Sequence, residues 1–132
     1  MLQLNKIYKQ YFSIIIMEQD CIFCKIVNKE IPKELTYEDD NFIAFLDISP
    51  RAQGHTLIIP KQHFKTLLDL PNTLGTELQQ AIKKVSLNLT QKLKAQGFNI
   101  FTNIGEVSGQ VVPHLHIHVV PRKNQDNLKN IL

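Results

Sequence analysis

Apolar residues recur at helical spacing in the middle of the chain. They stand three or four positions apart, at Leu74, Leu78, Ile82, Val85, Leu89 and Leu93. This spacing places them on one face of a helix. Pro71 and the two polar residues after it supply start signals, and Gly97 supplies a stop signal. The pattern predicts a long helix over residues 74–96 with one face turned to a core.

Shorter apolar stretches on both sides of this helix have the character of strands. Residues 42–46 and 55–60 flank a polar loop and predict a hairpin. Residues 37–41 have the pattern of a strand end and a turn, and residues 98–102 predict a strand after the long helix. These segments are linked by short connections, which favours antiparallel pairing.

A second, short helix is predicted near the N-terminus. Asp20 is a suitable cap for a helix over residues 21–28, and Ile31-Pro32 ends it. The chain of 132 residues suits one domain with a real core. Together the elements predict an α+β fold, in which an antiparallel sheet carries a short N-terminal helix and one long helix.

The two ends of the chain differ from its middle. We expect residues 1–16 to be a disordered or loosely packed extension, residues 17–123 to form the domain, and residues 124–132 to be a polar tail. The apolar stretch in the extension is too short for a signal peptide, and no run approaches the roughly 18 apolar residues that cross a bilayer. An upstream start codon, with Met17 as the functional one, or a targeting role would explain the extension. We expect no membrane partner.

Charge and cysteine content narrow the function classes further. The net charge is +3, of which the two lysines of residues 1–16 supply +2, so the remainder carries only +1. A nearly neutral domain lacks the electrostatic footprint of a nucleic-acid binder, so we expect no nucleic-acid partner. A disulfide between Cys21 and Cys24 would close too small a loop to stabilise a fold. This favours a reducing, cytoplasmic location and a metal or redox role for the pair.

The run His114-Leu115-His116-Ile117-His118 carries the most distinctive chemistry. Residues 114–120 predict the last strand, closed by Pro121, with the imidazoles on one face about 7 Å apart and the residues between them in the core. A polar edge-strand face, a three-histidine metal site and nucleophilic chemistry are the three interpretations. We favour the last, because neutral imidazole attacks phosphorus and the preceding loop 105–110 can offer N–H groups, and the Ser108 hydroxyl, to phosphate oxygens.

With Gly109-Gln110 before it, this run resembles the His-φ-His-φ-His-φ-φ signature of the histidine triad (HIT) superfamily of nucleotide hydrolases and transferases. Residues 44–50 and 54–61 also resemble family segments, in the expected order. The resemblance covers about residues 20–123 and is nearest to the Hint-like and bacterial Hit branch. It implies a HIT-like, dimeric fold, with the long helix and strand 98–102 as the interface.

The resemblance also implies a role for each site residue. His116 would attack the α-phosphate of a purine nucleotide conjugate, His118 would contact the phosphate and help the leaving group depart, and His55 would support them. Asp47 would accept hydrogen bonds from the ribose. The other implied nucleotide contacts are Phe23, Ile26, Phe45, Leu46, Ile48, Asn103, Gly109, Gln110 and Val111. On local grounds alone, the apolar residues among these would be core, Asp47 a turn former and His55 a structural histidine.

The implied activity is that of a nucleoside phosphoramidase-type hydrolase, acting on phosphoramidates or acyl-AMP through a covalent nucleotidyl-histidine. A dinucleoside polyphosphate hydrolase and a purine-nucleotide-binding or scaffold protein with little catalysis are the alternatives. Val111 keeps them open, because many Hint and Fhit members carry Ser or Thr there. The chain has no tryptophan, so the tryptophan-bearing C-terminus of Hint enzymes is missing. Pro121-Arg122 is closer to the Fhit and bacterial Hit ending, whereas Asn103 matches Hint-like proteins.

The spacing of Cys21 and Cys24 lets both thiolates reach one ion. A structural zinc usually has four ligands. By resemblance to zinc-containing family members, His63 and His114 would be the other two, and the ion would pin the N-terminal helix to the sheet. A redox dithiol and an inert pair of thiols are the alternatives.

Overall fold

The computed structural model describes residues 20–128, so the predicted extension and Met17 lie outside the described residues. In chain order the elements are α2 (Ile22–Val27), β1 (Tyr37–Glu38), β2 (Phe42–Leu46), β3 (Thr56–Pro60), the 3-10 turns η1 (Leu67–Asp69) and η2 (Asn72–Leu74), α3 (Gly75–Leu93), β4 (Gly97–Phe101), the 3-10 turn η3 (Glu106–Ser108), and β5 (Ile117–Arg122). The strands form one sheet in the order β1-β2-β3-β5-β4, and every neighbouring pair is antiparallel. The predicted α+β fold is confirmed.

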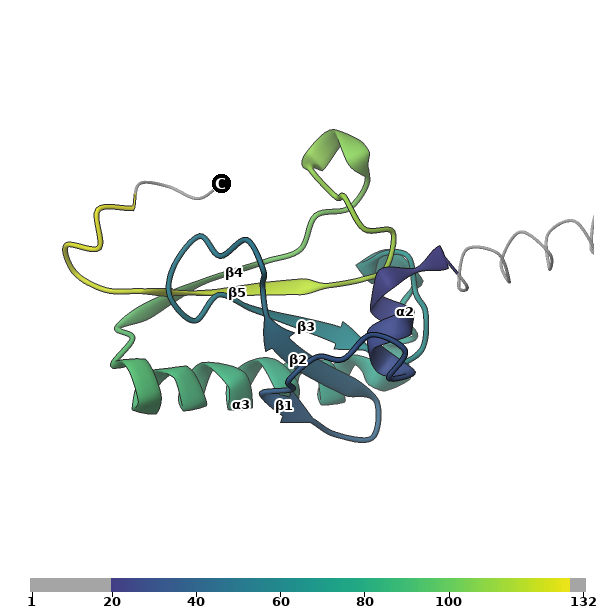
Figure 1. The fold of residues 1–132 in the computed structure, drawn as a ribbon, viewed down its shortest axis with the longest axis horizontal. Helices are drawn as coiled ribbons and strands as arrows, with labels where there is room; N and C mark the ends of the chain where they lie inside the picture. Colours follow the sequence, from purple (N-terminus) through teal and green to yellow (C-terminus); the bar gives the residue numbers. More distant parts are fainter. Residues whose placement is uncertain (1–19, 129–132) are drawn as a thin grey trace, which may run out of the picture.

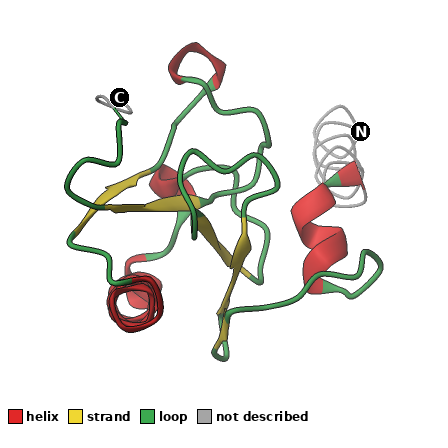
Figure 2. Cartoon of the chain, turned by 60° about the vertical axis from the view of Figure 1, so that its left-hand side comes forward, coloured by secondary structure: helices red, strands yellow, loops and turns green. Residues whose placement is uncertain are grey.

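Helix α3 covers one face of the sheet (Figures 1 and 2). Its predicted apolar face is confirmed, since Leu78, Val85 and Leu89 are buried in the cluster that includes the β2 and β5 side chains. The helix ends earlier than predicted. Lys94 adopts a left-handed φ of 58° and donates its N–H to the carbonyl of Thr90 at 3.1 Å. A left-handed residue caps the helix in this way, so Gly97 is left to begin β4.

Helix α2 lies on the other face of the sheet (Figure 2). Its buried residues join a second apolar cluster with Ile43, Phe45, Leu57 and Ile59. The predicted cap, Asp20, is wrong. Cys21 is the N-cap residue, and its Sγ accepts the N–H of Cys24 at 3.4 Å. A residue selected here as a candidate metal ligand therefore also organises the first turn of the helix.

The predicted strand over residues 114–120 needs correction, because β5 is Ile117–Arg122. The backbone of the preceding segment pairs elsewhere: the N–H of Leu115 donates to the Phe64 carbonyl at 2.6 Å. At the other end the strand runs on through Pro121. Pairing with β3 stops at Val119, whereas pairing with β4 continues to Arg122. Proline, which has no N–H, is tolerated where a strand borders no partner on one side.

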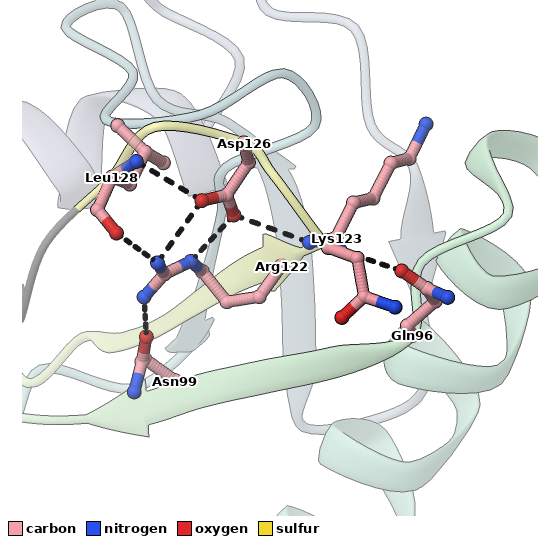
Figure 3. Close-up of polar contacts among 7 residues, drawn as sticks. Gln96, Asn99, Arg122, Lys123, Asp126 and Leu128 are labelled. Atoms are coloured by element: carbon pink, nitrogen blue, oxygen red, sulfur yellow. Dashed lines mark hydrogen bonds and ion pairs between the residues drawn. The ribbon is translucent and has the colours of Figure 1, made fainter.

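The C-terminal residues fold back beside the end of β5 (Figure 3). The Arg122 guanidinium donates to the Asp126 carboxylate at 2.8 and 3.2 Å, to Asn99 Oδ1 at 2.8 Å and to the Leu128 carbonyl at 2.6 Å. The predicted tail thus begins with an ordered turn over residues 124–128. Across the described residues 20–128, helices long and apolar enough to span a membrane are absent.

Candidate active site and metal centre

The three clustered histidines share one face of the chain, as alternation predicts. Leu115, Ile117 and Val119 are buried in the cluster beneath α3. His114 and His116 are buried, and His118 is partly buried. The alternation therefore holds, although only His118 of the three lies within the paired strand.

A backbone carbonyl determines which ring nitrogen of His116 carries the hydrogen. Its Nδ1 lies 2.7 Å from the carbonyl oxygen of His114. A carbonyl only accepts, so Nδ1 carries the hydrogen and donates it. Burial lowers the pKa of His116 below its ordinary value, which favours the neutral ring. The Nε2 atom of His116 consequently keeps a lone pair.

In His118 the outer nitrogen carries the hydrogen, the opposite of His116. Two hydrogen bonds in series determine this tautomer. The backbone N–H of Arg51 donates to Nδ1 of His55 at 3.0 Å, so His55 carries its hydrogen on Nε2. That Nε2 lies 3.0 Å from Nδ1 of His118, which accepts. Burial and then the neighbouring His116 and His55 lower the pKa of His118 to about 4. Neutral His118 therefore carries its hydrogen on Nε2.

The two outer nitrogens are chemically complementary. The rings of His116 and His118 have centroids 5.1 Å apart. His116 offers a lone pair on Nε2, and His118 offers an N–H on Nε2. A nucleophile beside a hydrogen-bond donor is the arrangement that attack on a phosphoryl group needs.

Asp47 lies beside the two paired histidines. Its Oδ2 is 3.5 Å from Nε2 of His55. Its Oδ1 accepts the N–H of Ser49 at 2.9 Å, as a turn-forming aspartate does. The local interpretation of Asp47 is thus supported, and its contact with a ribose stays a prediction.

The glycine loop before the histidines is held by Gln110. Gly105 and Gly109 have φ angles of 88° and 100°, a region that favours glycine. The buried Gln110 side chain accepts the N–H of Gly105 at 2.8 Å and donates to the carbonyls of Lys65 at 2.8 Å and Val112 at 3.1 Å. Both side-chain N–H groups of Gln110 are therefore engaged within the chain. Val111, by contrast, is 88% exposed.

Most of the residues expected to line a nucleotide pocket lie near the histidines, Asp47 or the glycine loop, and one, Leu46, lies elsewhere. Phe23 contacts the ring of His116 edge-on at 5.3 Å, and Ile26 and Phe45 are buried in the same cluster. Exposed Ile48 follows Asp47, and Asn103 Nδ2 lies near Gly109. Leu46 is not brought together with the others: it lines a cavity with Val85 and Leu89, beside α3.

Cys21, Cys24, His63 and His114 converge on one point, with their ligand atoms within 4.8 Å of one another. Cys21 Sγ lies 3.3 Å from His114 Nδ1, Cys24 Sγ 3.2 Å from His63 Nδ1, and the two Nδ1 atoms lie 3.1 Å apart. A tetrahedral zinc with sulfur and nitrogen ligands spaces them by about 3.3–3.8 Å. The four residues therefore fit such an ion with shifts of no more than about 1 Å.

Two further features of this cluster suit a metal. Nε2 of His114 lies 2.9 Å from the Pro60 carbonyl and donates to it, which turns the lone pair of Nδ1 inward. The backbone N–H of Cys24 donates to Sγ of Cys21 at 3.4 Å, which stabilises negative charge on the sulfur. The thiolate, which is the form that binds zinc, is favoured.

Sequence reasoning missed two residues at the histidines, Phe101 and Arg51. Phe101 stands directly opposite His118 in the β4–β5 register, and Arg51 lies in the loop before His55. The predicted strand 98–102 already contained Phe101, but its partner depends on register. The alternation along two paired strands is the signal from which the contact could have been found.

Comparisons with known proteins agree with this geometry. A family model described as HIT domain matches residues 28–125. An uncharacterized HIT-like protein of Methanocaldococcus jannaschii is 44% identical over 106 residues, which cover 80% of this chain and 81% of the relative. The adenosine 5'-monophosphoramidase HNT1 of Saccharomyces cerevisiae is 38% identical over 109 residues, covering 83% of this chain and 66% of the enzyme.

A solved structure adds a likeness in three dimensions. The zinc-bound histidine triad family protein from Mycobacterium smegmatis has a TM-score of 0.79 and 40% identity, covering 85% of this chain and 81% of that protein. The fold, the histidine run and the similarity over most of the chain lead to one conclusion. This chain belongs to the HIT domain family.

Proposed function

We propose that the protein is a nucleotide hydrolase that cleaves a bond at the α-phosphate of purine nucleotide conjugates, of the phosphoramidate or acyl-AMP type. The proposal rests on two hydrogen bonds that give the outer nitrogens of two neighbouring rings opposite protonation. Nε2 of His116 bears a lone pair because Nδ1 donates to His114, and Nε2 of His118 bears a hydrogen because Nδ1 accepts from His55. The similarity to a yeast adenosine monophosphoramidase supports this class of substrate.

In the first step, the His116 Nε2 lone pair attacks the α-phosphorus of a phosphoramidate. A phosphorus–nitrogen bond to His116 forms and the bond to the leaving nitrogen breaks. The leaving nitrogen keeps the electron pair and takes a proton from solvent, so it departs as an amine. The His118 N–H hydrogen-bonds to a phosphoryl oxygen, where negative charge grows during attack. The product of the step is a nucleotidyl-His116 enzyme.

In the second step, water attacks the same phosphorus and its proton passes to solvent. The bond to Nε2 of His116 breaks, and the lone pair returns to the ring. The nucleoside monophosphate leaves, and His116 is neutral again because its Nδ1 keeps its hydrogen, donated to the His114 carbonyl, throughout. Overall, one conjugate and one water give one nucleotide and one amine. Loop 105–110 is proposed to hold the phosphate through backbone N–H groups.

We further propose that Cys21, Cys24, His63 and His114 hold a structural zinc ion. When bound, the ion supplies a cross-link between α2 and the segment that leads into β5. This role is supported by the convergence of the four ligand atoms and by the zinc-bound family structure. The residues that perform the reaction stay the chain's own histidines.

The test is a comparison of wild type with His116→Asn on an adenosine 5'-phosphoramidate. Wild type is expected to release AMP and, after rapid quenching, to show by intact mass a fraction of protein carrying one adenylyl group. In His116→Asn, turnover should fall by a factor on the order of 10³ or more, as expected for removal of a nucleophile. Calorimetry should show that this variant still binds AMP. Turnover of this variant at the wild-type rate would refute the mechanism.

Two other outcomes separate the alternatives. AMP binding by wild type without turnover or an adenylyl-enzyme would identify a binding protein. Faster hydrolysis of a dinucleoside polyphosphate than of the phosphoramidate would assign the chain to the other hydrolase class. His118→Gln serves as the matched variant, since it removes an imidazole from the same face and leaves the proposed nucleophile in place.

A further inference from the structure

The ring of Phe101 stacks on the ring of His118. The two residues stand opposite each other in β4 and β5. Their ring centroids lie 4.5 Å apart and the planes are inclined by only 11°, which is a stacked arrangement. The contacts of His118 with His55 and His116 are inclined by 51° and 63°. Phe101 therefore contacts a face of the imidazole rather than an edge.

A histidine ring needs such a surface if its outer nitrogen is to point in one direction. The torsion that turns the imidazole is broad and roughly two-fold, so the rotamer well alone does not fix the ring plane. The bond between Nε2 of His55 and Nδ1 of His118, at 3.0 Å, fixes the position of one atom. It leaves the ring free to rock about that atom. Stacking of the imidazole against the Phe101 ring restricts this rocking.

Arg51 contacts both of the groups that hold His118. Its guanidinium carbon lies 6.0 Å from the centroid of the Phe101 ring, within the range of a cation–π interaction. Its backbone N–H donates to Nδ1 of His55 at 3.0 Å and so decides which nitrogen of His55 donates to His118. One loop residue thereby links the stacking surface to the hydrogen-bond donor.

We infer that Phe101, held by Arg51, is a positioning residue that fixes the plane of the His118 ring and so keeps its Nδ1 on the His55 donor for attack on the substrate. The inference rests on the proposed function of His118 as a donor to the phosphoryl group. Phe101 acts through His118, so its loss should lower kcat and leave nucleotide affinity nearly unchanged. A misplacement of about 1 Å in a catalytic group can cost roughly a hundredfold in rate.

The experiment compares Phe101→Leu with Phe101→Tyr, which keeps the aromatic face. For Phe101→Leu we expect kcat on the adenosine phosphoramidate to fall about 10-fold or more, with KM and the Kd for AMP within about a factor of three. Phe101→Tyr should retain wild-type kcat. Arg51→Met, which keeps the stem and removes the guanidinium, should lie between them. Thermal unfolding and zinc content of each variant show whether the fold is kept.

A second readout is independent of turnover. Two-bond ¹H–¹⁵N correlation spectra of the histidine rings report which nitrogen carries the hydrogen. We expect one tautomer of His118 in wild type and Phe101→Tyr, and a mixture or an altered ¹⁵N pattern in Phe101→Leu. If wild type has no hydrolase activity, the proposed function fails, and these spectra still decide the positioning role.

Three results would overturn the inference. The first is a Phe101→Leu variant that is folded and has wild-type kcat. The second is a loss of AMP affinity equal to the loss in kcat, which would show that Phe101 serves nucleotide binding rather than the positioning of His118 for attack. The third is an unchanged ring spectrum of His118 in Phe101→Leu.

Discussion

The backbone N–H of Arg51 lies 3.0 Å from Nδ1 of His55 and donates to it. This one bond places the hydrogen of His55 on Nε2, on the side of His118. Gly54, just before His55, has a φ of 86°, and a side-chain carbon there would come within 2.4 Å of Leu93. The tight loop that brings Arg51 back onto His55 thus depends on glycine. A backbone turn, rather than a further side chain, determines the proton arrangement of the site.

His55→Gln and His55→Leu test this arrangement as a matched pair. The amide nitrogen of Gln can replace Nε2 of His55 as a donor to His118, whereas Leu donates nothing. We expect the Leu variant to lose roughly 100-fold in kcat and the Gln variant to stay within about 10-fold of wild type. Steady-state kinetics on an adenosine phosphoramidate measure both. Equal losses in the two variants would show that donation to His118 is unimportant.

The depressed pKa of His118 predicts how stability depends on pH. Burial, followed by the neighbouring histidines, lowers this pKa from 6.5 to about 4. As pH falls below 6.5 the unfolded chain takes up a proton that the folded chain does not take up until about pH 4. The stability contributed by neutral His118 is therefore present above pH 6.5 and is lost as pH falls towards 4.

Urea unfolding of wild type and His118→Gln at pH 7 and pH 5 checks this prediction. Both proteins keep the zinc ligands, so the difference between them isolates His118. Wild type is expected to lose more free energy of unfolding than the variant over this interval. Parallel losses would mean that His118 does not titrate differently in the folded and unfolded chains.

The fold was predictable where periodicity alone decides it. The long helix, the hairpin of β2 and β3, and the inward alternation after His114 follow from spacing. The ends of the helices were not predictable from spacing, because they depend on local hydrogen bonds and backbone conformation. The left-handed Lys94 ends α3 without a glycine, and the Cys21 thiol caps α2 in place of Asp20.

The site was predictable in its members but not in its proton arrangement. Alternation and the family resemblance select His116, His118 and His55. The hydrogen positions depend on backbone groups of His114 and Arg51, which sequence patterns do not place. Leu46 shows the converse: the family resemblance implied that it lines the pocket, yet strand alternation turns it towards α3.

The cysteine–histidine cluster predicts about one zinc per chain. Protein purified without chelator should carry about one equivalent by elemental analysis, and Cys24→Ser should carry much less. Removing the ion with a chelator should lower Tm by roughly 5 °C or more, because α2 loses its cross-link to the sheet. Less than about 0.2 equivalents in protein with both thiols reduced would contradict the assignment.

Gln110 is predicted to keep the phosphate loop in shape. Gln110→Glu keeps an acceptor for the Gly105 N–H but turns an oxygen towards the carbonyls of Lys65 and Val112. We expect a loss of about 1–3 kcal/mol in the free energy of unfolding and faster amide exchange in residues 105–110. The exposed Gln62→Glu is the matched control. If both variants show the same loop exchange, the Gln110 contacts do not hold the loop.

The free edge of β4 predicts a homodimer, as the family resemblance implies. Within the described part of the chain, β4 is an outer strand of the sheet, and an uncovered strand edge invites pairing with another chain. Ile100 on this strand is 45% exposed and Leu87 on α3 is 64% exposed. Both side chains are suited to burial between two subunits.

Ile100→Lys and Leu87→Lys should therefore convert a dimer into a monomer while leaving the fold intact, since neither side chain belongs to the buried clusters. Light scattering after size exclusion measures the mass, and thermal unfolding checks the fold. Leu68→Lys, which changes an exposed leucine of η1, should remain dimeric. Wild type that elutes with the mass of one chain would remove the dimer proposal, and lysine variants that stay dimeric would move the interface to another surface.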